Sequence, residues 1–237
     1  MKYEKKRVLI IGMARSGIAA AQLLLSHGAI PLLNDEKSEE VLAEGLLALR
    51  NTACEFHMGE DPLVLLDSCD SVVISPGVPI DAPVVRAARQ QGIPLIGELE
   101  LAFSLLQGEV LAISGTNGKT TTTTLLGKMF ENAGRITYVA GNIGYPLSAV
   151  ALVSRKSDVV VVEVSSFQLE SIKTFHPLVS ALLNITEDHL NRHGTMEQYT
   201  RIKQRIFENQ TAEDVAVLNL DDPELAKMGD KLKARVA

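Results

Sequence analysis

One segment constrains the fold of this chain more than any other: the short apolar run Val110–Ser114 leads directly into Gly115-Thr-Asn-Gly-Lys-Thr120. Helical spacing then runs over Lys119–Asn132, so the sequence predicts a strand, a glycine turn and a helix. Backbone N–H groups of such a turn form a nest for an anion, and the helix N-terminus adds partial positive charge. The turn is a shortened variant of the usual phosphate loop. We predict that it binds nucleotide phosphates, with Lys119 at the terminal phosphates and the Thr120 hydroxyl on Mg²⁺.

A single acid follows the next apolar strand. Val159–Val162 is a run of four valines, which is typical of a strand buried on both faces of a parallel sheet, and Glu163 comes directly after it. Because neighbouring strand ends meet beside the phosphate loop, Glu163 is predicted to be the Mg²⁺ carboxylate. The alternative is a solvated acid at the end of a strand.

The first hundred residues alternate short apolar runs with helical spacing, a pattern that builds a parallel sheet. The expected strands are Arg7–Ile11, Ile30–Asn34, Ser71–Ile74 and Leu95–Ile96, and the expected helices are Ser16–Ser26, Ser38–Leu49 and Pro83–Gln91. The pattern restarts at the phosphate loop. We therefore expect two domains, residues 1–97 and 98–237, with a connecting helix over 98–107.

The first turn of the chain, Gly12-Met-Ala-Arg-Ser-Gly17, reproduces most of a dinucleotide-binding fingerprint, and Asp35 ends the second strand. Ala14 replaces the glycine that lets a backbone approach a pyrophosphate, which argues against NAD and an oxidoreductase. Two interpretations of this turn remain. It binds another phosphate-bearing ligand, with Asp35 accepting a hydrogen bond from a hydroxyl of that ligand, or it is a purely structural turn. The loop Ser75-Pro-Gly-Val-Pro79 falls at the same sheet edge and is either a plain turn or a ligand wall.

Composition excludes several classes of function. Lys plus Arg number 23 and Asp plus Glu 29, giving a net charge of −6, and aromatic residues make up only 4%, so a nucleic-acid partner is not expected. Cys54 and Cys69 lack the spacing of a metal site and favour reduced thiols in a reducing cytosol. The apolar run Val8–Ile11 is too short for a signal peptide or a membrane span.

The later motifs are less specific when read from the residues alone. His189 ends Asn184-Ile-Thr-Glu-Asp-His189 and Lys203 lies on a polar helix, and neither pattern decides between a structural and a functional role. The residues alone thus predict an ATP-type nucleotide with Mg²⁺ in the second domain, another anionic ligand in the first, and phosphoryl chemistry.

Taken together, the motifs resemble the Mur ligase family, which is ATP-dependent, and the resemblance covers the whole chain. It is carried by the phosphate loop, Gly141-Asn-Ile-Gly144, Glu163-Val-Ser-Ser-Phe-Gln168, Thr186-Glu-Asp-His-Leu-Asn-Arg-His-Gly194 and Lys203. The first turn, Asn34-Asp35, Ser75-Pro-Gly77 and Ser165-Ser-Phe-Gln-Leu169 are similar to those of members that add D-glutamate to UDP-N-acetylmuramoyl-L-alanine during cytoplasmic peptidoglycan synthesis. The implied fold is α/β: a Rossmann-like parallel-sheet N-terminal domain followed by a truncated P-loop-type ATPase α/β domain.

The resemblance implies a role for each matching residue. ATP would contact Gly115, Thr116, Asn117, Gly118, Lys119, Thr120, Thr121 and Asn142. The UDP-sugar substrate would contact Arg15, Ser16, Asp35, Glu36, Ser75, Pro76, Gly77, Asn142, Ser165 and His189. Two Mg²⁺ ions would be held by Thr120, Glu163, His189 and a carbamylated Lys203, and the catalytic residues would be Lys119, His189 and Lys203.

The family also has a third domain that carries much of the amino-acid site, and part of its adenine pocket lies beyond Asp221-Asp222. The expectation is that this chain is the amino-terminal part of a monomeric ligase, which alone keeps the UDP-sugar site but makes little or no product. The competing hypotheses are a non-catalytic UDP-sugar-binding module and another Mur-type amino-acid ligase.

Overall fold

The computed structural model describes residues 2–237, which form two compact units. The first unit contains the described residues up to Leu106 together with Pro146–Val153 and Ser171–Lys173. The second unit contains Gln107–Tyr145, Ser154–Glu170 and Thr174–Ala237. Each unit is built around its own parallel sheet, so the α/β fold class expected from the sequence is confirmed.

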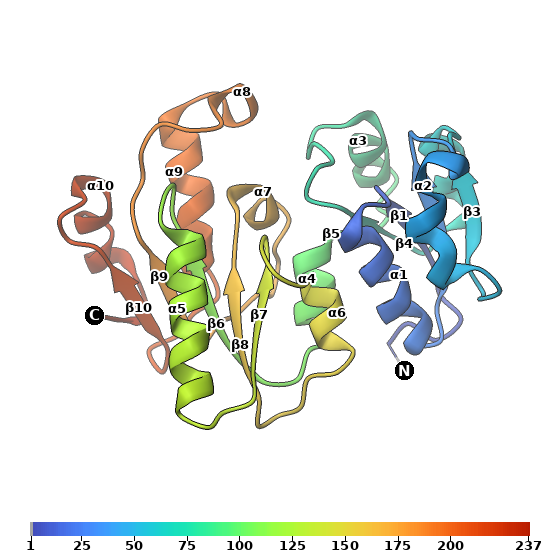
Figure 1. Cartoon of the computed structure of the whole chain (residues 1–237). Helices are drawn as coiled ribbons and strands as arrows, with labels where there is room; N and C mark the ends of the chain where they lie inside the picture. The colour runs from blue at the N-terminus through green and yellow to red at the C-terminus, as the bar shows by residue number, and fades with distance from the viewer. Residues whose placement is uncertain (1) are drawn as a thin grey trace. The chain divides into compact units, whose positions relative to one another are not determined.

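The sheet of the first unit has the strand order β3-β2-β1-β4-β5, and all its pairs are parallel (Figure 1). Its strands are β1 (Arg7–Ile11), β2 (Ile30–Asp35), β3 (Glu55–Met58), β4 (Ser71–Ile74) and β5 (Leu95–Gly97). Its helices are α1 (Arg15–Ser26), α2 (Glu39–Leu46), η1 (Leu47–Leu49), η2 (Pro62–Ser68), α3 (Pro83–Gln90), α4 (Glu98–Phe103) and α6 (Leu147–Ala151). The strand order reverses on either side of β1, and ligands of open parallel sheets bind at the carboxyl edge beside such a reversal.

Alternating side chains of β1 fill cores on both faces of this sheet. Leu9 and Ile11 belong to a buried cluster that η2 and α3 complete. Val8 and Ile10, which point to the other face, are fully buried. Helix α1 packs against β1 and β2. A strand that is apolar on both faces is the expected signature of a helix-covered parallel sheet.

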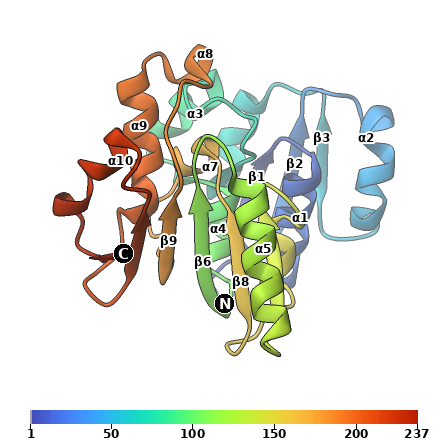
Figure 2. The same cartoon turned by 60° about the vertical axis from the view of Figure 1, so that its left-hand side comes forward.

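The sheet of the second unit has the order β11-β10-β9-β6-β8-β7, again with all pairs parallel (Figure 2). Its strands are β6 (Glu109–Ser114), β7 (Thr137–Gly141), β8 (Val159–Glu163), β9 (Val179–Leu182), β10 (Val215–Leu218) and β11 (Arg235–Val236). Its helices are α5 (Lys119–Asn132), α7 (Ser166–Leu169), α8 (Leu190–His193), α9 (Met196–Gln204), η3 (Arg205–Phe207), α10 (Pro223–Ala226) and η4 (Gly229–Lys231). Here the order reverses at β6, and α5 packs over β6, β7 and β8.

The observed elements differ from the expected ones in three respects. The helix expected over 98–107 is the shorter α4. The reason is packing: Leu99, Leu101 and Ala102 are buried, and α4 lies against α1 and α6. The segment 38–49 divides into α2 and η1, and the sequence reasoning did not identify β3, β7, β10 and β11.

Two smaller observations bear on the sequence analysis. Cys54 and Cys69 are free and half-buried, and burial raises the pKa of both thiols. Among residues 2–237, no helix combines the length and apolar character needed to cross a membrane.

Candidate functional site

The glycine turn of the second unit lies at the carboxyl end of β6, where the strand order reverses. Gly115 has a φ of 150° and Gly118 a φ of 82°, both in the region that favours glycine. A Cβ on Gly115 would also lie 3.1 Å from the Cβ of Leu183. Gly118 caps α5 without a side-chain hydrogen bond, and no acidic residue occupies the first turn of the helix. The N-terminus of α5 thus keeps the free N–H groups and the partial positive charge that attract a phosphate.

Three side chains from different elements join at the end of β8. Glu163 is 1% exposed, and its Oε2 accepts a hydrogen bond from Thr120 Oγ1 at 2.8 Å. Its Oε1 accepts one from Asn142 Nδ2 at 2.7 Å. Carboxylate and hydroxyl oxygens are the ligand type that Mg²⁺ prefers, so the Thr120–Glu163 pair fits a magnesium ion shared with phosphate oxygens. Among residues 2–237, no cluster of three or more His, Cys, Asp or Glu is placed to hold a metal ion by itself.

Two lysines meet at one backbone carbonyl. Lys119 Nζ donates hydrogen bonds to Gly115 O at 2.9 Å and to Thr116 O at 2.8 Å. Lys203 Nζ, on α9, donates to the same Gly115 O at 2.7 Å, and the residue is 1% exposed. Burial, with a smaller contribution from the charge of Lys119, lowers the pKa of Lys203 from 10.5 to about 7. A large fraction of Lys203 is therefore a neutral amine near neutral pH.

The tip of the glycine turn is bound to the segment that follows β9. Asn184 Oδ1 accepts a hydrogen bond from Asn117 N at 2.8 Å, and Asn184 Nδ2 donates to Asn117 O at 3.0 Å. Thr116 Oγ1 donates to Thr186 O at 3.1 Å and accepts from Thr186 N at 3.0 Å. The Tyr199 hydroxyl lies 3.3 Å from the same Thr116 oxygen. We call these contacts of residues 116–117 with 184–186 and Tyr199 the loop latch.

Sequence reasoning gave no role to Asn184 or Tyr199. A signal was present for both, since Asn184 follows a strand as Glu163 does, and Tyr199 lies one helical turn before Lys203 on α9. The ammonium of Lys203 lies 4.8 Å from the centre of the Tyr199 ring. The latch and the two lysines therefore belong to one site.

His189 is positioned differently from the other predicted metal ligands. It caps α8 with a φ of 52°, its side chain is 47% exposed, and its Nε2 lies 3.3 Å from Asp188 Oδ2. Its ring lies 4.9 Å from that of Phe167, centre to centre. The contacts recorded among residues 2–237 link His189 to Phe167 and Asp188 rather than to the Thr120–Glu163 pair.

Ser165 was expected to contact substrate, and in the structure it caps α7. Its hydroxyl accepts a hydrogen bond from Gln168 N, and Gln168 Oε1 accepts one from Ser165 N, which completes a capping box. The cap stabilises the turn that follows Glu163. Next to it, the buried His193 ring lies 3.0 Å from Ser166 Oγ through Nε2, and burial lowers the pKa of His193.

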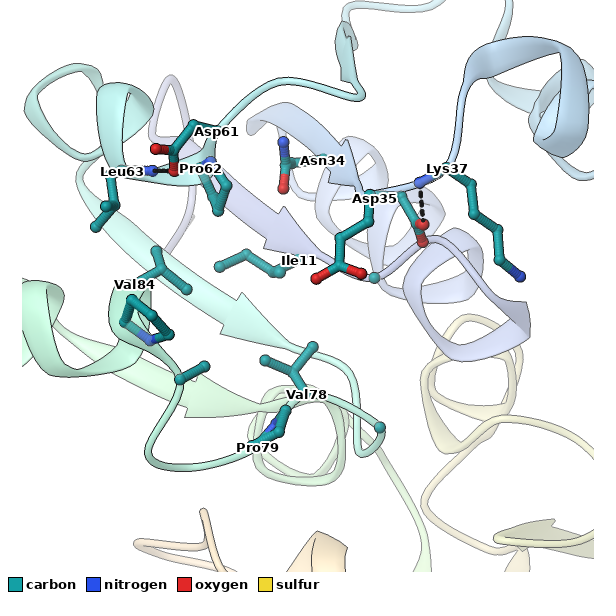
Figure 3. A pocket seen from close by; sticks show the side chains of 15 residues that line it. Ile11, Asn34, Asp35, Lys37, Asp61, Pro62, Leu63, Val78, Pro79 and Val84 are labelled. Atoms are coloured by element: carbon teal, nitrogen blue, oxygen red, sulfur yellow. Dashed lines mark hydrogen bonds between the residues drawn. The ribbon is translucent and has the colours of Figure 1, made fainter.

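A second site lies within the first unit, at the carboxyl edge of its sheet. A cavity of about 530 Å³ opens there (Figure 3). It is lined by Ile11, Gly12, Asn34, Asp35, Glu36, Lys37, Asp61, Pro62, Leu63, Gly77, Val78, Pro79, Ala82, Pro83 and Val84. Of the predicted substrate residues, Asp35, Glu36 and Gly77 line it, whereas Arg15, Ser16, Ser75 and Pro76, all described, lie outside the lining.

Asp35 and Ser75 both hold the first glycine turn in place. Asp35 Oδ2 accepts a hydrogen bond from Met13 N at 2.7 Å, and its Oδ1 accepts one from Lys37 N at 3.0 Å. Ser75 Oγ donates to Gly12 O at 2.7 Å. The carboxylate of Asp35, expected to accept from a ligand hydroxyl, thus already fixes two backbone segments at the cavity.

Comparison with known proteins identifies the family. The profile of the Mur ligase MurD-like N-terminal domain matches residues 6–97, and that of the Mur ligase middle domain matches residues 113–237. The chain belongs to the Mur ligase family. The predicted resemblance is therefore confirmed at the level of the family.

Individual Mur ligases are similar over the full length of this chain. UDP-N-acetylmuramoylalanine--D-glutamate ligase of Alkaliphilus metalliredigens is 50% identical over 237 residues, which are 99% of this chain and 52% of that protein. The enzyme of the same name from Alkaliphilus oremlandii is 48% identical, with coverage of 99% and 52%. The chain thus spans about half the length of the curated relatives it matches.

A solved Mur ligase shares the fold. UDP-N-acetylmuramate:L-alanyl-gamma-D-glutamyl-meso-diaminopimelate ligase of Neisseria meningitides superposes with a TM-score of 0.67 at 22% identity. The superposition covers 98% of this chain and 76% of that one. The two-sheet Mur ligase fold expected from the motifs is confirmed by this likeness.

Proposed function

We propose that this chain acts in an ATP-dependent ligase that joins D-glutamate to UDP-N-acetylmuramoyl-L-alanine, in the synthesis of peptidoglycan precursors. The observation that carries the proposal is the convergence of a phosphate loop, the Thr120–Glu163 pair and the buried Lys203 in one unit. The curated relatives described above bear the name of this ligase, which supports the choice of substrates.

The chemistry begins at a carboxylate, which is a poor electrophile and must be activated. The terminal carboxylate of the substrate attacks the γ-phosphorus of ATP, and ADP leaves as an acyl phosphate forms. The amine of D-glutamate then attacks the acyl carbon, and the tetrahedral intermediate expels inorganic phosphate and releases a proton to give the amide. In this scheme Lys119 exchanges the Gly115 and Thr116 carbonyls for the γ-phosphoryl oxygens, where its charge stabilises the transition state.

The residues around Glu163 fit the metal that this reaction requires. Thr120 and Glu163 would hold one Mg²⁺, and His189 a second together with Lys203. When bound, Mg²⁺ neutralises phosphate charge and orients the oxygens for transfer. Gly115, Thr116, Asn117, Gly118, Thr121 and Asn142 would surround the nucleotide phosphates. Asn142, Ser165 and His189 would lie toward the reacting end of the substrate.

Lys203 has the properties needed for carbamylation. A neutral amine adds to CO₂ and loses a proton to give an anionic carbamate, whose oxygens are metal ligands. The lowered pKa of Lys203 makes the neutral amine available near neutral pH. A carbamate signal in ¹³C NMR after incubation with labelled bicarbonate, absent from Lys203→Ala, would support this role, whereas equal signals would contradict it.

The cavity of the first unit would take the UDP part of the substrate. Asp35, Glu36 and Gly77 line it, and the first turn of α1 with Arg15 and Ser16 would face the diphosphate, beside Ser75 and Pro76. We further propose a cytoplasmic monomer. Because the chain spans about half the length of its curated relatives, we propose that it binds the nucleotide sugar on its own without completing the reaction.

The deciding experiment measures ADP formation by the full-length protein. Continued turnover of ATP to ADP should require UDP-N-acetylmuramoyl-L-alanine and D-glutamate together with Mg²⁺, and the product should gain one glutamyl residue in mass spectrometry. A second measurement titrates the protein with UDP-N-acetylmuramoyl-L-alanine, UDP-N-acetylmuramic acid and NAD. Tight binding without any ADP formation would favour a non-catalytic UDP-sugar module, and preferential binding of NAD would overturn the proposal.

A further inference from the structure

One polar side chain in the cavity of the first unit is held in a fixed orientation. Asn34, near the end of β2, is 2% exposed. Its Nδ2 donates to His57 O and to Glu60 O, both at 2.9 Å, so both amide hydrogens are used. Because only the nitrogen end of the amide can donate to two carbonyls, these bonds fix the position of Oδ1.

The amide oxygen of Asn34 faces the cavity. Figure 3 shows Oδ1 on the side of Ile11 and Nδ2 on the far side. Within residues 2–237, no donor forms a hydrogen bond with Oδ1, and the lining residues Ile11, Leu63 and Val84 are apolar. An acceptor held in this position is available to a hydrogen-bond donor of a ligand or of a water in the cavity.

The lining also indicates which part of a ligand would lie beside Asn34. Pro62, Leu63, Val78 and Pro79 give the cavity apolar walls, which suit the face of a planar ring. Lys37 is the only basic residue among the described lining residues, so the cavity lacks the positive cluster that a diphosphate would need. The ring must present a donor to the Asn34 oxygen.

We propose that Asn34 is a specificity-determining residue whose Oδ1 accepts a hydrogen bond from the ring N3–H of a uracil base. This inference rests on the proposed function, in which the cavity takes the UDP part of the substrate. Uracil carries a hydrogen on N3, whereas neutral cytosine presents a lone pair there, which would face another lone pair on Asn34. Turning the amide to suit cytosine would break both bonds to His57 and Glu60, so the site selects uridine over cytidine nucleotides.

The first test needs no substitution. The chain is titrated calorimetrically with UDP, with 3-methyluridine 5′-diphosphate, which lacks the N3 hydrogen, and with CDP. The chain should bind UDP on the order of 10-fold or more tightly than either analogue, because neither analogue offers a ring N–H donor to Asn34 Oδ1. Affinities for UDP and its 3-methyl analogue within about twofold of one another would overturn the inference and leave the proposed function standing. Failure to bind UDP at all would overturn both.

The second test separates a hydrogen bond from a steric effect of the added methyl group. Asn34→Ala removes the acceptor and leaves more space, so UDP should bind more weakly and the preference over the 3-methyl analogue should fall to about twofold or less. Asn209→Ala, which removes an asparagine amide from the second unit, should keep the full preference. If Asn34→Ala retained the preference of the unchanged chain, the discrimination would be steric and the inference wrong. The ligand comparison in the unchanged chain remains decisive even if the variant does not fold.

Discussion

At the scale of single residues, the Gly115 carbonyl is the feature that organises the candidate site. It accepts hydrogen bonds from Lys119 and Lys203, which are far apart in the sequence and lie on different helices. Two amines at one oxygen repel each other when both are charged, which contributes to the lowered pKa of Lys203. A phosphate that binds the Lys119 amine would leave Lys203 as the remaining lysine at the Gly115 carbonyl.

Lys119→Ala in the full-length protein should lower the rate of ADP formation by at least ~10² to 10³, the usual effect of removing one contact with transition-state charge. Steady-state kinetics with all three substrates would measure it. Lys128→Ala is the matched control, because Lys128 lies on the same helix and pairs with Glu131 at the surface. A loss of less than about threefold in Lys119→Ala would exclude Lys119 from the phosphoryl step.

The lowered pKa of Lys203 also predicts a pH dependence of stability. Between about 7 and 10.5 the unfolded chain binds a proton at this lysine that the folded chain does not, so the free energy of unfolding rises with pH across that range. Below about 7 both states are protonated, and the folded state bears the full cost of the buried ammonium. Lys203→Met should therefore raise Tm most at acid pH, with a gain that shrinks as the pH rises.

Thermal unfolding of Lys203→Met and the unchanged chain in CO₂-free buffers across this pH range would measure the gain. Lys128→Met, at an exposed position, should show no such trend. A gain that stayed constant with pH would mean that the Lys203 amine titrates as it does in the unfolded chain.

At the scale of elements, the strand ends of the second sheet explain why the site forms where it does. β6, β8 and β9 are adjacent and parallel, so the glycine turn, Glu163 and Asn184 emerge at one edge. The loop latch then joins the turn to the segment after β9 through paired hydrogen bonds. If the turn binds a phosphate as proposed, the latch would fix it beforehand and so lower the ordering cost of binding.

Asn184→Ala should weaken ATP binding by roughly 10-fold, because it removes both bonds to Asn117 and lets the turn move. Tm should change little, since these bonds lie at an exposed loop. Calorimetric titration of the chain with ATP and Mg²⁺ would give the affinity, and Asn209→Ala, which also loses an asparagine hydrogen bond to a backbone carbonyl, is the control. Unchanged ATP affinity in Asn184→Ala would mean that the turn is rigid without the latch.

Within the first unit, Glu98 at the start of α4 is a buried carboxyl that accepts a hydrogen bond from Ser148 N at 2.7 Å. Burial raises its pKa, so the folded state holds the proton to higher pH than the unfolded state does. Its contribution to stability is complete below the unfolded pKa and is lost as the pH rises through the folded pKa. Glu98→Gln, which cannot ionise, should gain Tm over the unchanged chain as the pH is raised from about 4 to about 7.

Thermal unfolding across that range would test this, with Glu44→Gln on the exposed face of α2 as the control. A Glu98→Gln chain that lost stability equally at every pH would show that the Glu98 carboxyl titrates in the folded chain as it does in the unfolded chain.

Particular elements show what the sequence could predict. α5 begins and ends where the spacing predicted, because a glycine turn starts it and Gly134 follows its end. β3 was missed because Glu55–Met58 is a short strand at the edge of the sheet, in which apolar Phe56 and Met58 alternate with polar residues and every residue is half-buried. The Thr120–Glu163 pair followed from the convergence of strand ends. The Lys203–Gly115 bond joins residues 88 positions apart, and periodicity within one helix holds no information on such a contact.

At the scale of the whole molecule, the same architectural rule operates twice. Each unit has a parallel sheet whose strand order reverses beside its first strand in the chain, β1 or β6, and a glycine turn follows that strand. The first unit adds an apolar cavity with a fixed acceptor, whereas the second adds lysines and a carboxylate. In the proposed function, the first unit would bind a base and the second would carry out phosphoryl chemistry.

This specialisation predicts separate patterns of protection in hydrogen exchange. UDP should slow exchange in the Gly12–Gly17 turn and at the end of β2, whereas ATP with Mg²⁺ should slow it in Gly115–Thr121 and at the end of β8. At a ligand concentration of 100 Kd the bound state is stabilised by about 2.7 kcal/mol, enough to slow exchange clearly wherever the ligand holds the backbone. Mass spectrometry of the chain with each ligand alone would locate the protection. If ATP protected the first unit and left the Gly115–Thr121 turn unchanged, the glycine turn after β6 would not be the nucleotide site, and the proposed division of roles would be wrong.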